Sequence, residues 1–173
     1  MANCALTQDY SFGCDVGVGG TKEMYMIELE NISAFTESSG TLTAITKVTG
    51  KVFRKYQLVL ETANFEEDIT GNRANGTLFY GQKGTIILNK QQVAMRNEIM
   101  LLAKNRLVVI IKDNNLTYRL LGREFGLMLQ TGTATTGTAW GDRNGYTLNL
   151  TGSELELAPF VDPTVIATLQ TPG

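Results

Sequence analysis

The fold class follows from one stretch, residues 89–113, which reads NKQQVAMRNEIMLLAKNRLVVIIKD. Residues 89–104 contain neither Gly nor Pro, and Met95, Ile99 and Leu102 recur with the spacing of one helical face. Such periodicity is typical of a helix that packs one side against a core. We therefore predict a helix over about 89–104.

The ends of the predicted helix carry further signals, and so does the segment that follows it. Asn89 with Gln92 resembles a capping box, and the charge of Lys104 suits the carboxyl end of a helix. The run LVVII at 107–111 is apolar without interruption, unlike a strand with one solvated face. This run predicts a central strand that is covered on both faces.

Strand patterns fill most of the remaining chain. MYMIELE at 24–30 alternates with a period of two and predicts a half-buried strand. The pairs Asn-Gly at 75–76 and at 144–145 favour the positive φ of tight hairpin turns, so the strands that flank them should be antiparallel. The other predicted strands are 41–48, 51–61, 76–88, 106–113, 117–122, 126–131 and 146–152.

These elements predict an α+β fold of mainly antiparallel β-structure, a β-sandwich or barrel-like sheet with one packed helix. The length of 173 residues fits a single domain, 1–173. Within it we expect a long hairpin loop at about 64–77, a Gly/Thr-rich loop at 131–145 and an irregular C-terminal tail at 158–173. Long loops in compact domains are typically functional, so these segments are candidates for contacts with other molecules.

The composition disfavours several classes of function. The sequence contains no histidine, which removes the usual general base and the commonest metal ligand. The formal net charge of −2 lacks the basic excess of a nucleic-acid-binding domain. Cys4 and Cys14 stand apart from other soft ligands and are interpreted as two free thiols. We expect no enzyme activity, no catalytic residue, no metal, no cofactor, no signal peptide and no membrane contact.

Three motifs suggest chemistry, and each has a simpler interpretation. GVGGTK at 17–22 precedes a strand pattern, whereas a phosphate loop requires a helix directly after its lysine. Glu66, Glu67 and Asp68 are adjacent in an extended segment, so their side chains alternate between faces and fit a solvated hairpin rim. KVFRKY at 51–56 interleaves cations and rings on opposite faces, which disfavours a platform for single-stranded nucleic acid.

Charge is distributed in blocks along the chain. Acids predominate in 1–37 and 61–68, and bases predominate in 47–55 and 83–123. Blocks of opposite sign allow a basic region of one subunit to dock on an acidic region of a neighbour. The alternative is that they are solvated faces that average out in three dimensions, since exposed ion pairs contribute only ~0–1 kcal/mol.

The second half of the chain resembles a known family. It consists of NEIMLLAKNRLVVIIKDNNLTYRLLGREFGLML at 97–129 and TGTATTGTAWGDRNGYTLNLTGSELELAPF at 131–160, which includes the pattern GD-x-x-GY. The order of helix, central strand, hairpin, Gly/Thr-rich loop and final strand over about 85–162 resembles the tail tube (major tail) proteins of tailed bacteriophages. The N-terminal half fits the family through its pattern of long strands.

The resemblance implies a non-enzymatic virion protein that assembles into stacked hexameric rings, whose pooled strands line a conduit for DNA during ejection. The implied partners are the chain itself, through lateral and axial contacts, and other tail proteins such as the terminator, the tape measure and the baseplate or tip. Double-stranded DNA would pass transiently and without specificity. The implied location is the tail of the virion, assembled in the host cytoplasm.

Three groups of residues are candidates for the implied contacts. The candidate inter-ring hairpin carries Glu66, Glu67, Asp68, Asn72, Arg73 and Asn75. The candidate lumen or interface acids are Glu28, Glu30 and Glu61. The candidate assembly loop contains Thr133, Thr135, Thr138, Trp140, Asp142 and Arg143.

Two other interpretations stay open on the sequence. The first is another phage structural component, such as a tail terminator, a head-tail joining protein or a capsid decoration protein. The second is a small β-barrel module that binds a ligand or single-stranded nucleic acid. Oligomeric form separates them, because a tube protein polymerises, a terminator stops at one ring and a binding module stays monomeric.

Overall fold

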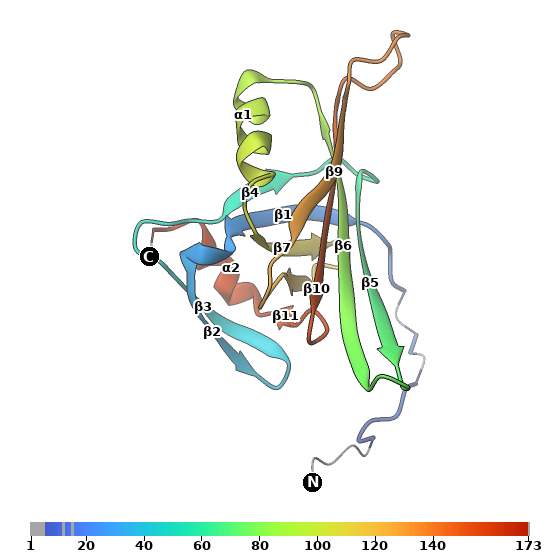
Figure 1. Ribbon diagram of the computed structural model, residues 1–173, viewed down its shortest axis with the longest axis vertical. Helices are drawn as coiled ribbons and strands as arrows, with labels where there is room; N and C mark the ends of the chain where they lie inside the picture. The colour runs from blue at the N-terminus through green and yellow to red at the C-terminus, as the bar shows by residue number, and fades with distance from the viewer. Residues whose placement is uncertain (1–5, 12, 15, 173) are drawn as a thin grey trace.

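The computed structural model describes residues 6–11, 13–14 and 16–172, and Figure 1 shows its two β-sheets and two α-helices. The fold is α+β with mostly antiparallel strands, which confirms the predicted class. The elements are β1 (Thr21–Glu28), the 3₁₀ helix η1 (Leu29–Asn31), β2 (Ile32–Ser38), β3 (Thr41–Lys47), β4 (Arg54–Gln57), β5 (Ala63–Asn72), β6 (Thr77–Asn89), α1 (Val93–Leu102), β7 (Leu107–Asp113), β8 (Tyr118–Leu121), β9 (Met128–Thr135), β10 (Gly145–Glu154), β11 (Phe160–Val161) and α2 (Pro163–Leu169).

The strands form two sheets that pack face to face. The larger one, sheet A, has the order β2-β3-β11-β8-β7-β1-β4, and the smaller one, sheet B, has the order β5-β6-β10-β9. Neighbours are antiparallel except β11 and β3, which pair in parallel. In Figure 1 the strands of sheet B follow the long axis of the molecule, whereas β1 and β7 of sheet A run across it.

The central strand β7 is covered on both faces, as its apolar run predicts. Leu107, Val109 and Ile111 belong to a first core, which lies between the two sheets and α1. Val108 and Ile110 belong to a second core on the other face of sheet A, where α2 packs. Two cores thus share one strand, because successive side chains of a strand point to opposite faces.

Strand β1 is buried more completely than its alternation predicts. Met24 and Met26 lie in the first core, and Tyr25 and Ile27 lie in the second. The prediction of a half-buried strand is wrong because the first core covers one face of β1 and the second core covers the other, so neither face meets solvent.

Helix α1 is shorter than predicted but packs as predicted. Leu102 is buried in the first core, and Met95 and Ile99 pack against it. The predicted start at Asn89 is wrong, because Asn89 is still part of β6 and Lys90 takes a positive φ of 70°. The capping box therefore does not form, and the cap residue makes no side-chain bond to the helix.

A second helix replaces the irregular tail predicted for 158–173. The carboxylate of Asp162 accepts a hydrogen bond from the first turn of α2, where a proline also fits without loss of a needed donor. Val165 and Leu169, four residues apart, are buried in the second core. The Asp-Pro start and this spacing are the sequence signals of the helix.

The predicted hairpin loop at 64–77 is largely strand, and the predicted loop at 131–145 is strand at both of its ends. Residues 64–72 pair with 77–85, which leaves only 73–76 as the turn of the β5–β6 hairpin. Strand β9 continues to Thr135 and pairs with β10. Gly145 lies in β10 rather than in a turn, and it is required there because a Cβ atom would lie 2.1 Å from the carbonyl oxygen of Leu88.

Candidate assembly surfaces

Sheet B has one buried face and one face without a covering element in the described chain. Ile86, Leu148 and Leu150 point inward to the first core. Alternation along the paired strands places mainly hydroxyl and amide side chains on the outer face. The threonines of this face are Thr70, Thr77, Thr85, Thr131, Thr133, Thr135, Thr147 and Thr151.

Hydrogen bonds link the polar side chains of this outer face across three strands. The hydroxyl of Thr85 donates to Oδ1 of Asn149 at 2.9 Å, and Nδ2 of Asn149 donates to the hydroxyl of Thr131 at 2.9 Å. The hydroxyl of Thr151 donates to Oε1 of Gln130 at 3.0 Å. These bonds hold the outer face as an ordered polar surface rather than a set of freely rotating side chains.

Charge on the outer face is low. Glu66 and Asp68 of β5 and Lys83 of β6 are its charged side chains, and Lys83 forms an ion pair with Asp68. An exposed pair of this kind contributes little to stability. The face therefore offers almost no free cation to a phosphate backbone.

Strand β9 forms an edge of sheet B and lacks the charges and prolines that usually protect edges. No charged residue and no proline occurs from Met128 to Gly141. The irregularity of its pairing opposite Asn149 and Leu150 is the single protective bulge of the described β9–β10 ladder. Natural proteins usually place charges, prolines or bulges on edges, because unpaired backbone groups are templates for another strand. The β9 edge is therefore suited to pairing with a second chain.

The β5–β6 hairpin extends past the core at the lower end of the molecule in Figure 1. It brings the residues of the candidate inter-ring hairpin to one element but not to one surface. Glu66 and Asp68 point outward, whereas Oε1 of Glu67 accepts bonds from Gln82 at 2.9 Å and from the amide of Ala158 at 2.8 Å. Glu67 thus connects the hairpin to the body.

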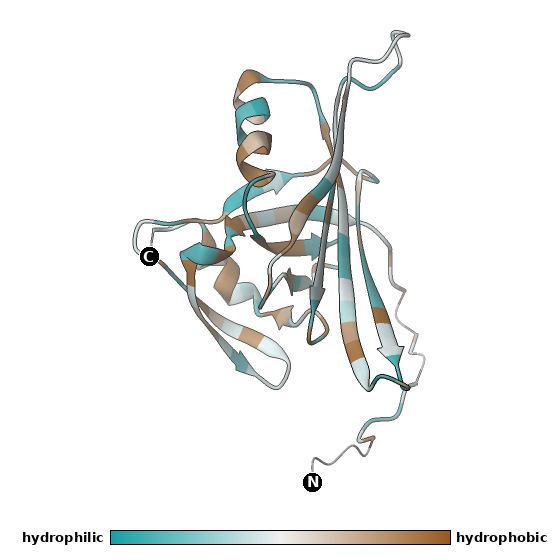
Figure 2. Cartoon of the chain, in the orientation of Figure 1, coloured by the Kyte–Doolittle hydropathy of each residue, from teal (hydrophilic) through white to brown (hydrophobic). Residues whose placement is uncertain are grey.

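The tip of this hairpin combines a capped turn with exposed apolar side chains. Oδ1 of Asn72 accepts from the amides of Ala74 and Asn75, which orders the turn around Arg73. Ile69 and Leu78 are 64% and 56% exposed, and both continue the inward-facing row of sheet B beyond the core. Figure 2 shows this apolar band at the lower end of β6.

The β9–β10 loop lies at the opposite, upper end of sheet B in Figure 1. Thr133 and Thr135 of the candidate assembly loop lie in strand β9. In the turn itself, the amides of Ala139 and Thr138 each donate to Asp142 at 2.8 Å and hold the pKa of this carboxyl below its ordinary value. Thr138, Arg143 and Trp140 are exposed, and the indole of Trp140 is fully so.

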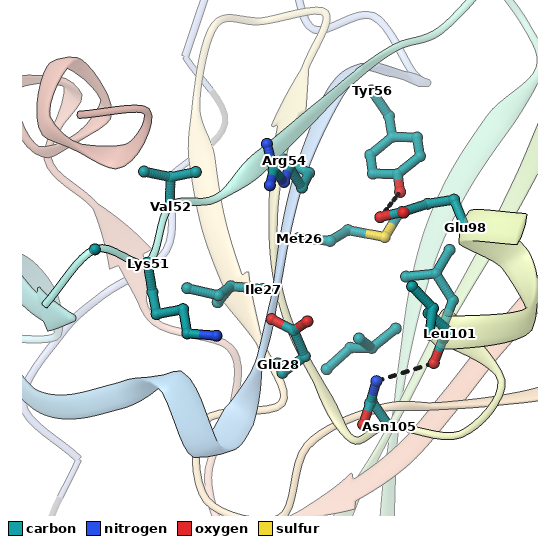
Figure 3. A pocket seen from close by; sticks show the side chains of 13 residues that line it. Met26, Ile27, Glu28, Lys51, Val52, Arg54, Tyr56, Glu98, Leu101 and Asn105 are labelled. Carbon is teal, nitrogen blue, oxygen red and sulfur yellow. Dashed lines mark hydrogen bonds between the residues drawn. The ribbon is translucent and has the colours of Figure 1, made fainter. Parts of the chain in front are cut away.

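The candidate acids Glu28, Glu30 and Glu61 do not form one surface. Glu28 accepts a bond from Nδ2 of Asn31 at 2.8 Å, Glu30 lies in η1, and Glu61 lies in the turn before β5 with a positive φ of 61°. Glu28 also lines a cavity of about 190 Å³ between β1, β4 and α1 (Figure 3). These acids occupy separate parts of the molecule, and none lies on the outer face of sheet B.

The aromatic residues of the 51–56 segment are used in packing. Phe53 is buried in the second core, and Tyr56 is buried in the first. The hydroxyl of Tyr56 donates to Oε1 of Glu98 at 3.4 Å (Figure 3). Burial raises the pKa of Tyr56, and the nearby carboxylate of Glu98 raises it further. Rings in two different cores cannot form a stacking platform for nucleic-acid bases.

Sequence reasoning missed a set of buried polar residues at the lower end of sheet B. The carboxylate of Glu154, which is 3% exposed, accepts bonds from the amides of Glu124, Phe125 and Gly126. Oε1 of Gln82 accepts from the amide of Gly122 at 2.9 Å. Gln82 and Glu154 have one signal in the sequence: each continues the alternating positions of its strand whose side chains face the core.

Several other features complete the description of the surfaces. Cys14 is exposed and its thiol is free, whereas Cys4 lies outside the described residues. Within the described chain, no three His, Cys, Asp or Glu side chains are grouped as a metal site. None of the helices described here has the length and apolar character required to cross a membrane.

Comparisons with known proteins yield one structural likeness. No protein-family model matches the sequence, and no curated protein matches it. Among solved structures, the chain is similar to one from the "Virion of native gene transfer agent (GTA) particle", with a TM-score of 0.39 and 7% identity. That match covers 64% of this chain and 89% of the other. A likeness of this size carries no argument about function.

Proposed function

We propose that the protein is a non-enzymatic virion structural protein, which self-assembles into stacked hexameric rings that form a phage tail tube. The observation that carries the proposal is the construction of sheet B. It joins a β9 edge that carries one bulge but no charge and no proline to an exposed face of mainly hydroxyl and amide groups. A protein that functions alone has no evident use for this combination.

Lateral contacts would use the two edges of sheet B. The β9 edge of one copy pairs with the β5 edge of the next, a heterologous contact that closes into a ring when the rotation allows it. Six four-stranded sheets pool roughly 24 strands, with a circumference of about 115 Å at the usual spacing between strands. Such a barrel encloses an open channel, whereas a barrel of about eight strands is filled by its own side chains.

The outer face of sheet B would line this channel. Its hydroxyl and amide groups are ordered by hydrogen bonds, and its one cation, Lys83, is paired with Asp68. Affinity for DNA comes mainly from free cations that contact phosphates. A lumen of this composition lets double-stranded DNA slide without specific binding during ejection.

Axial contacts would use the two ends of sheet B. The β5–β6 tip with Ile69 and Leu78 lies at one end, and the β9–β10 loop with Trp140 lies at the other (Figure 1). Stacking brings the end of one ring onto the opposite end of the next. At the ends of the tube, these surfaces are available to a terminator, a tape measure and a baseplate or tip.

Electron microscopy of the purified protein tests this proposal. On concentration we expect long hollow cylinders in negative stain, with a repeat along the axis. A single class of discrete rings would contradict the proposal in favour of a terminator or joining protein. Monomers at high concentration would contradict it in favour of a binding module.

A pair of matched variants tests the role of the β9 edge. Thr133→Lys places a charge on the edge strand, and Thr147→Lys places the same charge on the residue paired with it in the covered strand β10. Because lysine on an edge blocks strand addition, we expect Thr133→Lys to raise the critical concentration for assembly about tenfold, and Thr147→Lys to change it much less. Equal effects in sedimentation assays would contradict edge pairing.

A further inference from the structure

The N-terminal segment 6–18, called here the arm, carries large apolar side chains that lie in solvent. Every described residue of the arm is exposed, and Leu6, Tyr10 and Val16 are at least 90% exposed. Apolar side chains that gather in one exposed segment are candidates for contact with another molecule. The arm thus presents apolar groups that its own fold leaves in solvent.

The end of the arm near β1 is held firmly. The amide of Val18 donates to Oδ1 of Asn115 at 2.9 Å, and Nδ2 of Asn115 donates to the carbonyl of Val18 at 2.8 Å. Nδ2 of Asn114 donates to the carbonyl of Gly19 at 2.6 Å. These bonds aim the arm along the molecule toward its lower end, away from α1 (Figure 1).

A groove with matching chemistry lies near the other end of the molecule. It has a volume of about 570 Å³ and lies between β4, the end of β6 and α1. Val59, Leu88 and Met95 supply apolar surface to it, and Arg54 and Lys90 supply exposed cations. Neither of these two cations forms an ion pair with the described residues, whereas the groove acid Glu98 accepts a bond from Tyr56.

Charge and direction connect the arm to the groove. The sequence from residue 6 to residue 18 carries Asp9 and Asp15 and no basic residue, so the arm is acidic and partly apolar, and its chemistry complements a groove of apolar surface and unpaired cations. The arm runs toward the lower end of the molecule in Figure 1, whereas α1 and the end of β6, which contribute residues to the groove, lie in the upper half. An extended segment of this length spans about 40 Å, enough to cross between stacked subunits.

We propose that the arm of one copy docks in the groove of a second copy placed head to tail with it. Leu6, Tyr10 or Val16 enters the apolar part of the groove, and Asp9 faces Arg54 and Lys90. The inference rests on the proposed self-assembly in that the partner is another copy of this chain. It adds an interlock between rings that does not depend on pairing at the β9 edge.

The native thiol of the arm allows a direct test in the full-length chain. The donor is Cys4→Ser, which keeps Cys14, and the acceptor is Cys4→Ser/Cys14→Ser/Ala94→Cys, with its new thiol beside the groove. After the two are mixed and mildly oxidised, we expect disulfide-linked heterodimers on non-reducing gels. The matched control acceptor carries Ser153→Cys, which is exposed at the lower end of β10, in place of Ala94→Cys.

Charge reversal in the acceptor sharpens the test. Arg54→Glu/Lys90→Glu should lower the yield of heterodimer about tenfold, because like charges then face each other. Lys104→Glu, beyond the end of α1 and outside the groove, should leave the yield unchanged. A yield at Ala94→Cys no greater than at Ser153→Cys, or one insensitive to the groove charges, would overturn the inference.

The outcomes for the arm and for the tube are separable. Cylinders in the microscope without the Cys14 crosslink would overturn the arm contact and leave the proposed function standing. The crosslink in a protein that never forms cylinders would support the arm contact and contradict the tube.

Discussion

Sheet A and sheet B are built from similar strands but differ in their relation to solvent. Sheet A has apolar side chains on both faces, one set toward sheet B and α1 and the other toward α2. Sheet B has one apolar face and one face of hydroxyls and amides, and its hairpins extend past the core at both ends. Both faces of sheet A and the inner face of sheet B accordingly stabilise the fold, whereas the outer face and the two ends of sheet B are available for contacts with other copies.

The largest expected effect is at the core of sheet A, in comparison with the projecting tip of sheet B. Leu120 is fully buried in the second core, whereas Leu78 of sheet B is 56% exposed. Leu120→Ala should lower the free energy of unfolding by about 2–5 kcal/mol, because it leaves a cavity. Leu78→Ala should change it by less than about 0.5 kcal/mol. Urea unfolding of both variants measures this, and equal losses would show that the tip of sheet B stabilises the fold as much as the core of sheet A does.

A smaller effect is expected where the two sheets are joined. Glu154 of β10 accepts three amide hydrogen bonds from residues 124–126, which follow β8. Glu154→Gln replaces charge-assisted bonds with weaker ones and leaves an amide donor buried, so we expect a loss of about 2 kcal/mol. Glu156→Gln, at a side chain that is 76% exposed, is the control and should be close to neutral in urea unfolding.

The smallest expected effect is a pH-dependent change in stability, which should differ between the capped turns at Asp162 and Asp142. The hydroxyl and amide of Thr164 hold the pKa of Asp162 below its ordinary value of 3.8. A carboxyl whose native pKa is depressed stabilises the fold above its unfolded pKa, and this contribution is lost as the pH falls through the native pKa. Asp162→Ala should therefore destabilise at pH 7 and differ from the parent progressively less below pH about 4.

Asp142 provides the matched control for this pH effect. Its pKa is also depressed, by the amides of Ala139 and Thr138, but its turn projects from sheet B beyond the core. Opening that turn exposes no buried surface, so Asp142→Ala should leave global unfolding unchanged at both pH values. A pH-dependent loss of stability in Asp142→Ala would show that the β9–β10 loop is coupled to the core.

Much of the fold was predictable because local periodicity reports burial. The apolar run at 107–111 predicts a doubly covered strand, and Met95, Ile99 and Leu102 predict the packed face of α1. The predicted bounds are wrong where strand pairing lengthens a strand at the expense of a predicted helix or loop. Asn89 stays in β6 through its pairing with Gly145, and residues 131–135 become strand through pairing with β10.

The candidate surfaces were less predictable than the fold. The sequence points to the hairpin and to the Thr-rich segment, but it does not show that Glu67 faces inward or that Glu28, Glu30 and Glu61 lie apart. Whether a side chain faces solvent depends on which sheet covers which face, and this depends on residues far apart in the chain. The exposed arm and the groove with its unpaired cations have no local signature.

By itself, the sequence determined an α+β chain of mainly antiparallel strands, with the run at 107–111 at its centre, because alternation and apolar runs are properties of neighbouring residues. Only the tertiary structure decided that the strands form two sheets. It also decided that α2 closes a second core, that the β9 edge is left unpaired, and that the hairpins extend to opposite ends. Those outcomes depend on contacts between distant segments, and it is these contacts that determine which surfaces are left for assembly.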